Sequence, residues 1–167
     1  MNKSTVNFCP VPKEQQPICE YEQLKESWLF DWGILPIGQY IRKIAWVSFW
    51  SLVFAAPLSM SIYAPVKNPV AFTLSCIVGV ALLSGLFLSR IYLGWQYVKN
   101  RLKSDRIFYE ESGWYDGQTW LKPEAMLNRD RLVVSYEIEP ILDRLHKTYG
   151  SIAAIVVFSC LLWFLLG

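Results

Sequence analysis

Three long apolar segments constrain the fold of this 167-residue chain more than any other feature, and they cover residues 44–63, 70–98 and 151–166. An α-helix rises about 1.5 Å per residue, so about 20 apolar residues cross a hydrocarbon core of roughly 30 Å. Hydrophobic residues make up 53% of the sequence, which is more than an ordinary soluble domain carries. The sequence therefore predicts an α-helical integral membrane protein with three transmembrane helices.

Polar residues divide the chain into four expected regions. A polar N-terminal arm covers residues 1–43, and a transmembrane helical hairpin covers residues 44–98. Residues 99–150 form a small insert between the second and third spans, and residues 151–167 form the third transmembrane helix. We expect the insert to contain a hairpin followed by a helix.

The distribution of Lys and Arg predicts the orientation. These residues concentrate in the arm and the insert, whereas the connection between the first two spans has only Lys67 and the C-terminal tail has none. By the positive-inside rule, the arm and the insert share the cytoplasmic side and the C-terminus lies opposite. The N-terminus shows no signal or transit peptide pattern, so we expect the chain to begin in its own compartment.

Prolines and aromatic residues mark the ends of the apolar segments. The arm is expected to be extended up to Pro17 and to form a short helix within residues 20–30, because prolines oppose regular structure. Trp and Tyr collect at membrane interfaces, where Arg side chains reach the headgroups. We expect that role for Trp28, Phe30, Trp32, Arg90, Tyr92, Trp95 and Tyr97.

Small residues recur every four positions in the second segment, which is typical of helices that approach one another closely. The pattern includes Ser75-x3-Gly79, Ala81-x3-Gly85 and Gly85-x3-Ser89. We expect this face to pack against the first span.

The insert combines a hairpin signal with a helix start. Asp116-Gly117 separates two runs rich in aromatic and β-branched residues, which predicts a type I′ turn with positive φ at both positions. Lys122-Pro123-Glu124 is typical of a helix N-terminus. Residues 132–139 fit either a helix or a strand, and we favour a helix because the helical spacing continues past Pro140.

The residues offer little for catalysis or ligand binding. No known catalytic or nucleotide-binding motif occurs, His146 is the single histidine, and no one-sided basic surface indicates nucleic acid. Glu110, Glu111 and Asp116 are acidic neighbours, for which solvated carboxylates are favoured over a metal site. We therefore expect no enzymatic activity, no cofactor, no metal, no nucleic-acid partner and no small-molecule substrate.

Recognition is the function that the insert favours. Trp, Tyr and Arg dominate interface hot spots, and the insert concentrates these residue types. The alternative is that some of the rings form the core of a small folded unit. The predicted partner-binding residues are Tyr109, Trp114, Tyr115, Trp120, Arg129 and Arg131.

Three stretches resemble one family, the small membrane protein known as hypothetical chloroplast reading frame thirty-six. They are CPVPKEQQPICEYEQLKESW, YEESGWYDGQTWLKPEAMLNRDRL and EPILDRL. That family occurs in cyanobacteria, in algal plastid genomes and, nucleus-encoded, in the green lineage and diatoms. The resemblance implies a thylakoid or plastid membrane protein linked to photosynthesis, with the insert cytoplasmic or stromal and the C-terminus lumenal. It brings no established activity, cofactor or binding site.

We therefore expect a non-enzymatic accessory factor that binds membrane lipid and subunits of a photosynthetic complex during assembly or maintenance. One alternative is a permanent small subunit or stabiliser of such a complex. Another is a membrane enzyme or a redox sensor that uses Cys9 or Cys19.

Overall fold

A computed structural model describes residues 11–110 and 117–166, and most of these residues are helical. Within this part of the chain, three helices are long and apolar enough to cross a membrane by length and composition. The third is a continuous helix formed by α4, a π-helical turn η3 and α5. The elements are η1 (Lys13–Gln15), α1 (Pro17–Glu26), η2 (Asp31–Gly33), α2 (Ile37–Ile62), α3 (Pro69–Lys103), β1 (Arg106–Tyr109), β2 (Gln118–Leu121), α4 (Glu124–Val133), η3 (Val134–Ile138) and α5 (Glu139–Leu166).

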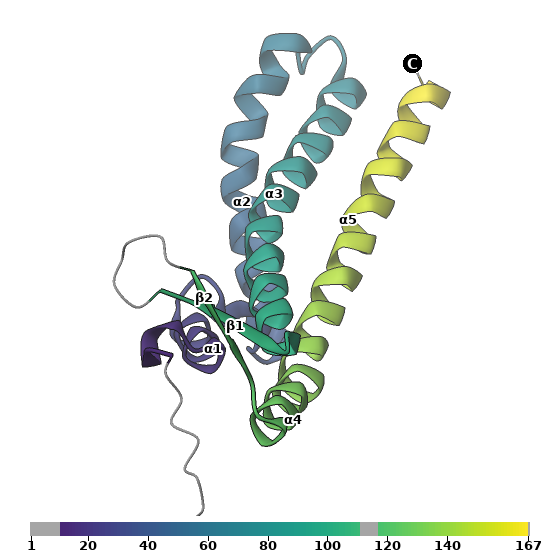
Figure 1. Cartoon of the computed structure of the whole chain (residues 1–167). Helices are drawn as coiled ribbons and strands as arrows, with labels where there is room; N and C mark the ends of the chain where they lie inside the picture. Colours follow the sequence, from purple (N-terminus) through teal and green to yellow (C-terminus); the bar gives the residue numbers. More distant parts are fainter. Residues whose placement is uncertain (1–10, 111–116, 167) are drawn as a thin grey trace, which may run out of the picture.

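The long helices share one crowded end (Figure 1). Helices α2 and α3 form an antiparallel hairpin, and α5 runs beside α3 toward the end where α2 and α3 are joined. The shorter elements gather at the opposite end. We call this end the polar module, which comprises η1, α1, η2, β1, β2, α4, η3 and the helix turns that they cover.

Both predicted hairpin helices are longer than their apolar segments. Helix α2 starts at Ile37 rather than at residue 44, and Pro57 lies inside it as expected. Helix α3 continues to Lys103, and its 35 residues correspond to about 52 Å at 1.5 Å each. This length exceeds the roughly 30 Å of a hydrocarbon core. The last turns of α3 are instead surrounded by the elements of the polar module.

The main hydrophobic core surrounds these last turns of α3. Trp95 is completely buried, its ring contacts that of Tyr21, and its Nε1 donates to the backbone oxygen of Phe30 at 3.2 Å. The expectation that Trp95, Phe30 and Trp32 face the membrane as aromatic anchors was therefore wrong, because all three side chains are buried in this core. Trp28, in contrast, is exposed.

Residues 132–139 are helical, which confirms the favoured reading. Residues 134–138 form the π-helical turn, and Pro140 follows in the first turn of α5, where the helix continues without its N–H. The face predicted from helical spacing is buried from the start of the turn onward, at Val134, Ile138, Ile141 and Leu145. Before the turn the buried position is Asp130, whereas Arg131 is exposed.

Small residues do bring α2 and α3 together. A Cβ on Gly79 would lie 2.9 Å from the Cβ of Ala55, so only glycine permits this approach. The hydroxyl of Ser59 donates to that of Ser75 at 3.1 Å across the same interface. The predicted packing of the second span against the first is confirmed at these positions.

The arm folds sooner than expected, because α1 begins at Pro17, where proline suits the first helical position. The guanidinium of Arg101 at the end of α3 donates to the Glu20 carboxylate at 2.6 Å and to the backbone oxygen of Gln15 at 3.3 Å. Arg101 thus fixes α1 to the end of α3 through Glu20, and it fixes η1 there through Gln15.

Strands β1 and β2 pair antiparallel, but the tight turn predicted between them is wrong. Tyr109 is paired with Gln118, which places eight residues, 110–117, between the paired positions. A two-residue type I′ turn would instead pair Gln118 with residue 115. Gly117 does not adopt positive φ, and among the described residues no atom beyond its chain neighbours lies within 4 Å of where its Cβ would be. Asp116 lies outside the described residues.

Candidate functional site: an interaction surface on the polar module

A buried ion pair joins the insert to α3. The Lys122 ammonium lies 2.9 Å from the Asp130 carboxylate, and their side chains are 0% and 1% exposed. Lys122 also donates to the backbone oxygens of Arg101 and Leu102, which belong to the last turn of α3. A cation at a helix C-terminus is favourable, because carbonyls there lack helical partners. The insert is therefore fixed to the last turn of α3.

The two-stranded sheet has one buried face. Ile107 and Tyr109 point toward Val11, and Trp120 and Met126 pack against this small core. Trp120 is paired with Ile107 in the sheet, so the two side chains share a face. The Tyr109 hydroxyl donates to the side-chain oxygen of Gln118 at 3.0 Å. Two rings predicted as partner contacts, Tyr109 and Trp120, therefore belong to the small core.

The other predicted partner residues have different positions. Arg129 and Arg131 are exposed, and they pair with Asp130 at 3.2 Å and with Asp105 at 3.5 Å, respectively. Trp114 and Tyr115 lie outside the described residues, as do Glu111 and Asp116 of the acidic group. The structure thus brings Tyr109 and Trp120 together and leaves the two arginines on the surface.

The second face of the sheet is exposed, and its apolar residues were missed. Phe108 is 67% exposed and Leu121 is 65% exposed. They lie on the same face because Leu121 pairs with Arg106, two residues before Phe108. Arg106 forms no ion pair with any described residue. Period-two alternation within RIFY places Phe108 opposite Ile107 and Tyr109, and this was the signal that could have identified it.

Two contacts hold the end of β1 in place. The Gln15 side-chain amide accepts from the Glu110 N–H at 2.9 Å and donates to the Glu110 backbone oxygen at 3.0 Å. This pattern imitates pairing with a neighbouring strand. We call the exposed residues Arg106, Phe108, Thr119 and Leu121 the outer sheet face. The sheet that carries it is held by Gln15 at the end of β1 and by Lys122 at the end of β2.

Helix α1 carries a partly buried carboxylate, Glu20. Burial raises the pKa of Glu20, and the nearby Arg101 guanidinium offsets this only in part. Tyr21 donates to the Glu137 carboxylate of η3, and burial followed by this hydrogen bond raises the pKa of the tyrosine. These contacts connect α1 to α3 and to the π-helical turn.

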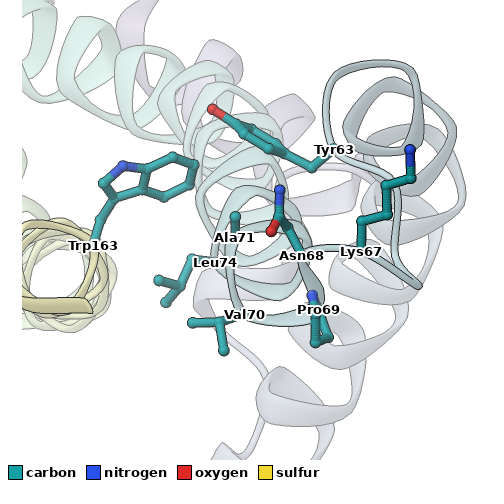
Figure 2. Close-up of a pocket in the computed structure, with 8 residues that line it drawn as sticks. All are labelled: Tyr63, Lys67, Asn68, Pro69, Val70, Ala71, Leu74 and Trp163. Atoms are coloured by element: carbon teal, nitrogen blue, oxygen red, sulfur yellow. The ribbon is translucent and has the colours of Figure 1, made fainter. Parts of the chain in front are cut away.

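The opposite end of the molecule is far less connected. The Tyr63 and Trp163 rings meet with centroids 5.1 Å apart, beside a hollow of about 470 Å³. Figure 2 shows the two rings on one side of this hollow, with Lys67 and Asn68 in the connection between α2 and α3. No group of three or more His, Cys, Asp or Glu residues is placed to hold a metal ion within the described ranges. We therefore take the outer sheet face as the candidate site.

Together, the three membrane-length apolar helices and the folded polar module at their common end define a helical protein with the architecture of a small multi-pass membrane protein. The chain belongs to the CGLD27-like family, described as conserved in the green lineage and diatoms 27, whose model matches residues 9–151.

Relatives cover nearly all of the chain. A protein of Pyropia yezoensis named uncharacterized protein ycf36 is 42% identical over 93% of this chain and 94% of its own length. The protein with that name from Cyanophora paradoxa is 38% identical over 93% and 98%. An Arabidopsis thaliana protein, conserved in the green lineage and diatoms 27, chloroplastic, is 39% identical over 92% of this chain and 47% of its own length. No solved structure shows significant similarity.

Proposed function

We propose that this protein is a non-enzymatic accessory factor of a photosynthetic membrane, which binds a photosynthetic complex during its assembly or maintenance. The family has relatives in red algae and glaucophytes and a relative named as chloroplastic, which supports a plastid or cyanobacterial setting. The three apolar helices support residence in a membrane. No residue arrangement in the described part of the chain supplies a reaction on which to base an enzyme.

We further propose that the membrane is the thylakoid and that the polar module faces the cytoplasm or stroma. Most Lys and Arg residues lie in the regions that form the module, as the positive-inside rule requires for that side. Helix α5 ends at the opposite end of the molecule, which corresponds to the lumen. The arm and the insert thus share one side in both the charge pattern and the geometry.

The outer sheet face is the observation that carries the proposed binding function. Phe108 and Leu121 are large apolar side chains in the part of the molecule that lies outside the membrane, where water exposure is unfavourable. They sit on a sheet fixed to α3 through Lys122 and to the arm through Gln15. A rigid support lowers the entropy that binding must overcome, which favours recognition.

Charge defines the chemistry of the partner segment. Arg106 lies on the outer sheet face without an ion pair to any described residue, and Arg131 is close by at Asp105. An arginine fork binds carboxylates in a bidentate manner. The partner segment is therefore a cytoplasmic or stromal stretch of a complex subunit that presents apolar side chains beside a carboxylate.

Affinity purification of the tagged protein from native membranes tests this function. The wild type recovers photosynthetic subunits at substoichiometric levels, enriched in incomplete complexes. Phe108→Ser combined with Leu121→Ser loses them, with an expected drop of at least about tenfold, while the amount of the variant in the membrane stays unchanged. Thr119→Ala, on the same face without apolar contact area, is the matched control.

The other outcomes are equally informative. Recovery of mature complexes at fixed stoichiometry would identify a permanent subunit instead. Unchanged recovery by the double variant would place the contact elsewhere on the molecule. Recovery of no photosynthetic subunit by the wild type would overturn the proposed function as a whole.

A further inference from the structure

Arg90 on α3 differs from the other arginines of that helix and of the module core. Arg101 and Arg144 donate hydrogen bonds to a carboxylate or to backbone oxygens. The Arg90 guanidinium stacks on the Phe30 ring at 5.3 Å, and it forms no ion pair or hydrogen bond with any described residue. Arg90 is exposed, so its guanidinium is free to donate hydrogen bonds to an external group.

The level of Arg90 along α3 is that of the membrane boundary. Residues 70–89, at about 1.5 Å each, already span a hydrocarbon core of about 30 Å. One turn further on, the Phe30 ring covers Gly94, and a Cβ there would lie 2.3 Å from Phe30 Cε1. The polar module therefore begins one helical turn beyond Arg90, toward the C-terminus of α3. If the helices span a membrane, the Arg90 charge lies at the depth of the lipid headgroups.

A groove of about 480 Å³ lies beside Arg90, between α1 and α3. Leu24, Phe30 and Leu93 supply apolar walls, and Gln23 and Ser27 supply polar groups. Below Arg90, Leu82 and Leu86 are exposed on the same face of α3, at four-residue spacing. The Arg90 cation and the polar side chains of the groove thus lie at one level of α3, and the exposed Leu86 and Leu82 follow below them. A lipid has the same order, with a polar headgroup followed by an acyl chain.

Glu20 lines the same groove and adds a second requirement. Its Oε1 accepts from Arg101, but its Oε2 is buried and has no hydrogen-bond partner among the described residues. A buried carboxylate oxygen is costly unless a donor reaches it. Burial also raises the pKa of Glu20, which weakens its repulsion of a neighbouring anion.

We propose that the groove between α1 and α3 is a binding site for one anionic lipid whose headgroup also carries hydroxyl groups. The phosphate or sulfonate binds the Arg90 guanidinium, the headgroup hydroxyls reach Glu20 and Ser27, and one acyl chain follows Leu86 and Leu82. The site requires that the helices span a membrane, and it does not depend on the binding of a photosynthetic complex.

Binding of defined lipids to the purified full-length protein in detergent tests the site. Native mass spectrometry counts the lipids retained from phosphatidylglycerol, from sulfoquinovosyl diacylglycerol and from neutral phosphatidylcholine. We expect one tightly retained anionic lipid per chain, and the more strongly retained of the two identifies phosphate or sulfonate as the anion. Arg90→Gln lowers its retention at least about tenfold, because a charge-assisted hydrogen bond is lost, and Arg90→Lys restores part of it.

Matched variants separate this site from general attraction to the membrane. Arg42 is an exposed cation at the start of α2 without an ion pair to a described residue, and Arg42→Gln is expected to change retention less than about twofold. Glu20→Gln reduces the preference for phosphatidylglycerol over phosphatidylmethanol, which lacks headgroup hydroxyls. Equal losses for the Arg42 and Arg90 variants, or equal retention of phosphatidylcholine, would overturn the proposal. A folded Arg90→Gln variant that retains the lipid would do the same.

Discussion

Both ends of the long helices carry aromatic and aliphatic side chains, but the two ends are held together in different ways. At the module end, Trp95, Leu102 and Leu145 are completely buried. The Arg101–Glu20 ion pair connects α3 to α1, and Lys122, paired with Asp130 of α4, donates to backbone oxygens of α3. At the other end, side chains such as Phe164 are exposed, and the Tyr63–Trp163 ring contact links α5 to the hairpin. In the proposed membrane setting, water drives apolar burial at the first end, whereas lipid solvates apolar surface at the second. Stability and specificity are therefore concentrated in the module.

The largest expected effect comes from breaking the buried pair in the module. Lys122→Met leaves the Asp130 carboxylate buried without its ammonium and leaves two α3 carbonyls without a donor. Removing one partner of a buried pair costs about 3–5 kcal/mol. Thermal unfolding in detergent, followed by circular dichroism or limited proteolysis, measures this loss.

The exposed pair in the same region serves as the control. Arg131→Gln removes the contact with Asp105, in which both side chains are more than half exposed, and exposed pairs contribute about 0–1 kcal/mol. Replacing both buried partners in Lys122→Met/Asp130→Leu is expected to recover part of the loss. Equal effects of the Lys122 and Arg131 variants would show that the buried pair does not fix the insert to α3.

Two glycines of α3 offer the next largest contrast. Gly94→Ala places a methyl group 2.3 Å from the Phe30 ring, which is buried and cannot move freely, and overpacking of this kind costs about 1–3 kcal/mol. Gly85→Ala meets no atom within 4 Å and should not lower stability. Paired melting curves in one detergent measure both. A loss at Gly85 as large as that at Gly94 would show that contact with the Phe30 ring is not what makes Gly94 necessary.

The sequence was sufficient for the helices but not for the inward faces of the module. Apolar length predicted α2 and α3, and helical spacing past Pro140 predicted the helix through residues 132–139. Asp130 lies four residues before Val134 on the same buried face, where it pairs with Lys122, and hydrophobic spacing does not identify a buried aspartate. Aromatic composition alone does not separate a buried ring such as Trp95 from an interface ring, because tryptophan is common in both places.

The candidate site was predicted only in part, for a related reason. Arg129 and Arg131 are exposed as a binding role requires, but Tyr109 and Trp120 fill the small core. Which face of a short strand is buried depends on what packs beneath it. Here Val11 from the distant arm covers the Ile107 face and leaves Phe108 exposed.

A smaller effect depends on pH. Burial holds the folded pKa of Glu20 above its ordinary value of 4.5, so the folded state binds this proton more readily than the unfolded state. The contribution of Glu20 to stability is therefore greatest below pH 4.5, and it declines as the pH rises through the folded pKa. The melting temperature of the wild type relative to Glu20→Gln is expected to fall between pH 4 and pH 7.

Glu22→Gln, on the exposed side of the same helix, is the control for removing one carboxyl group from α1. If the wild type instead gains stability relative to Glu20→Gln as the pH rises, then the contact with Arg101 outweighs burial at this carboxyl.

Site-specific photo-crosslinking compares the two ends most directly, because each offers an exposed phenylalanine. Phe108 is 67% exposed on the outer sheet face, and Phe158 is 62% exposed on α5. A photoreactive phenylalanine analogue is introduced at one position at a time, and crosslinks are induced in native membranes. We expect the analogue at position 108 to crosslink to a subunit of a photosynthetic complex and that at position 158 to crosslink mainly to lipid. Protein crosslinks from position 158 together with only lipid crosslinks from position 108 would contradict the assignment of recognition to the polar module.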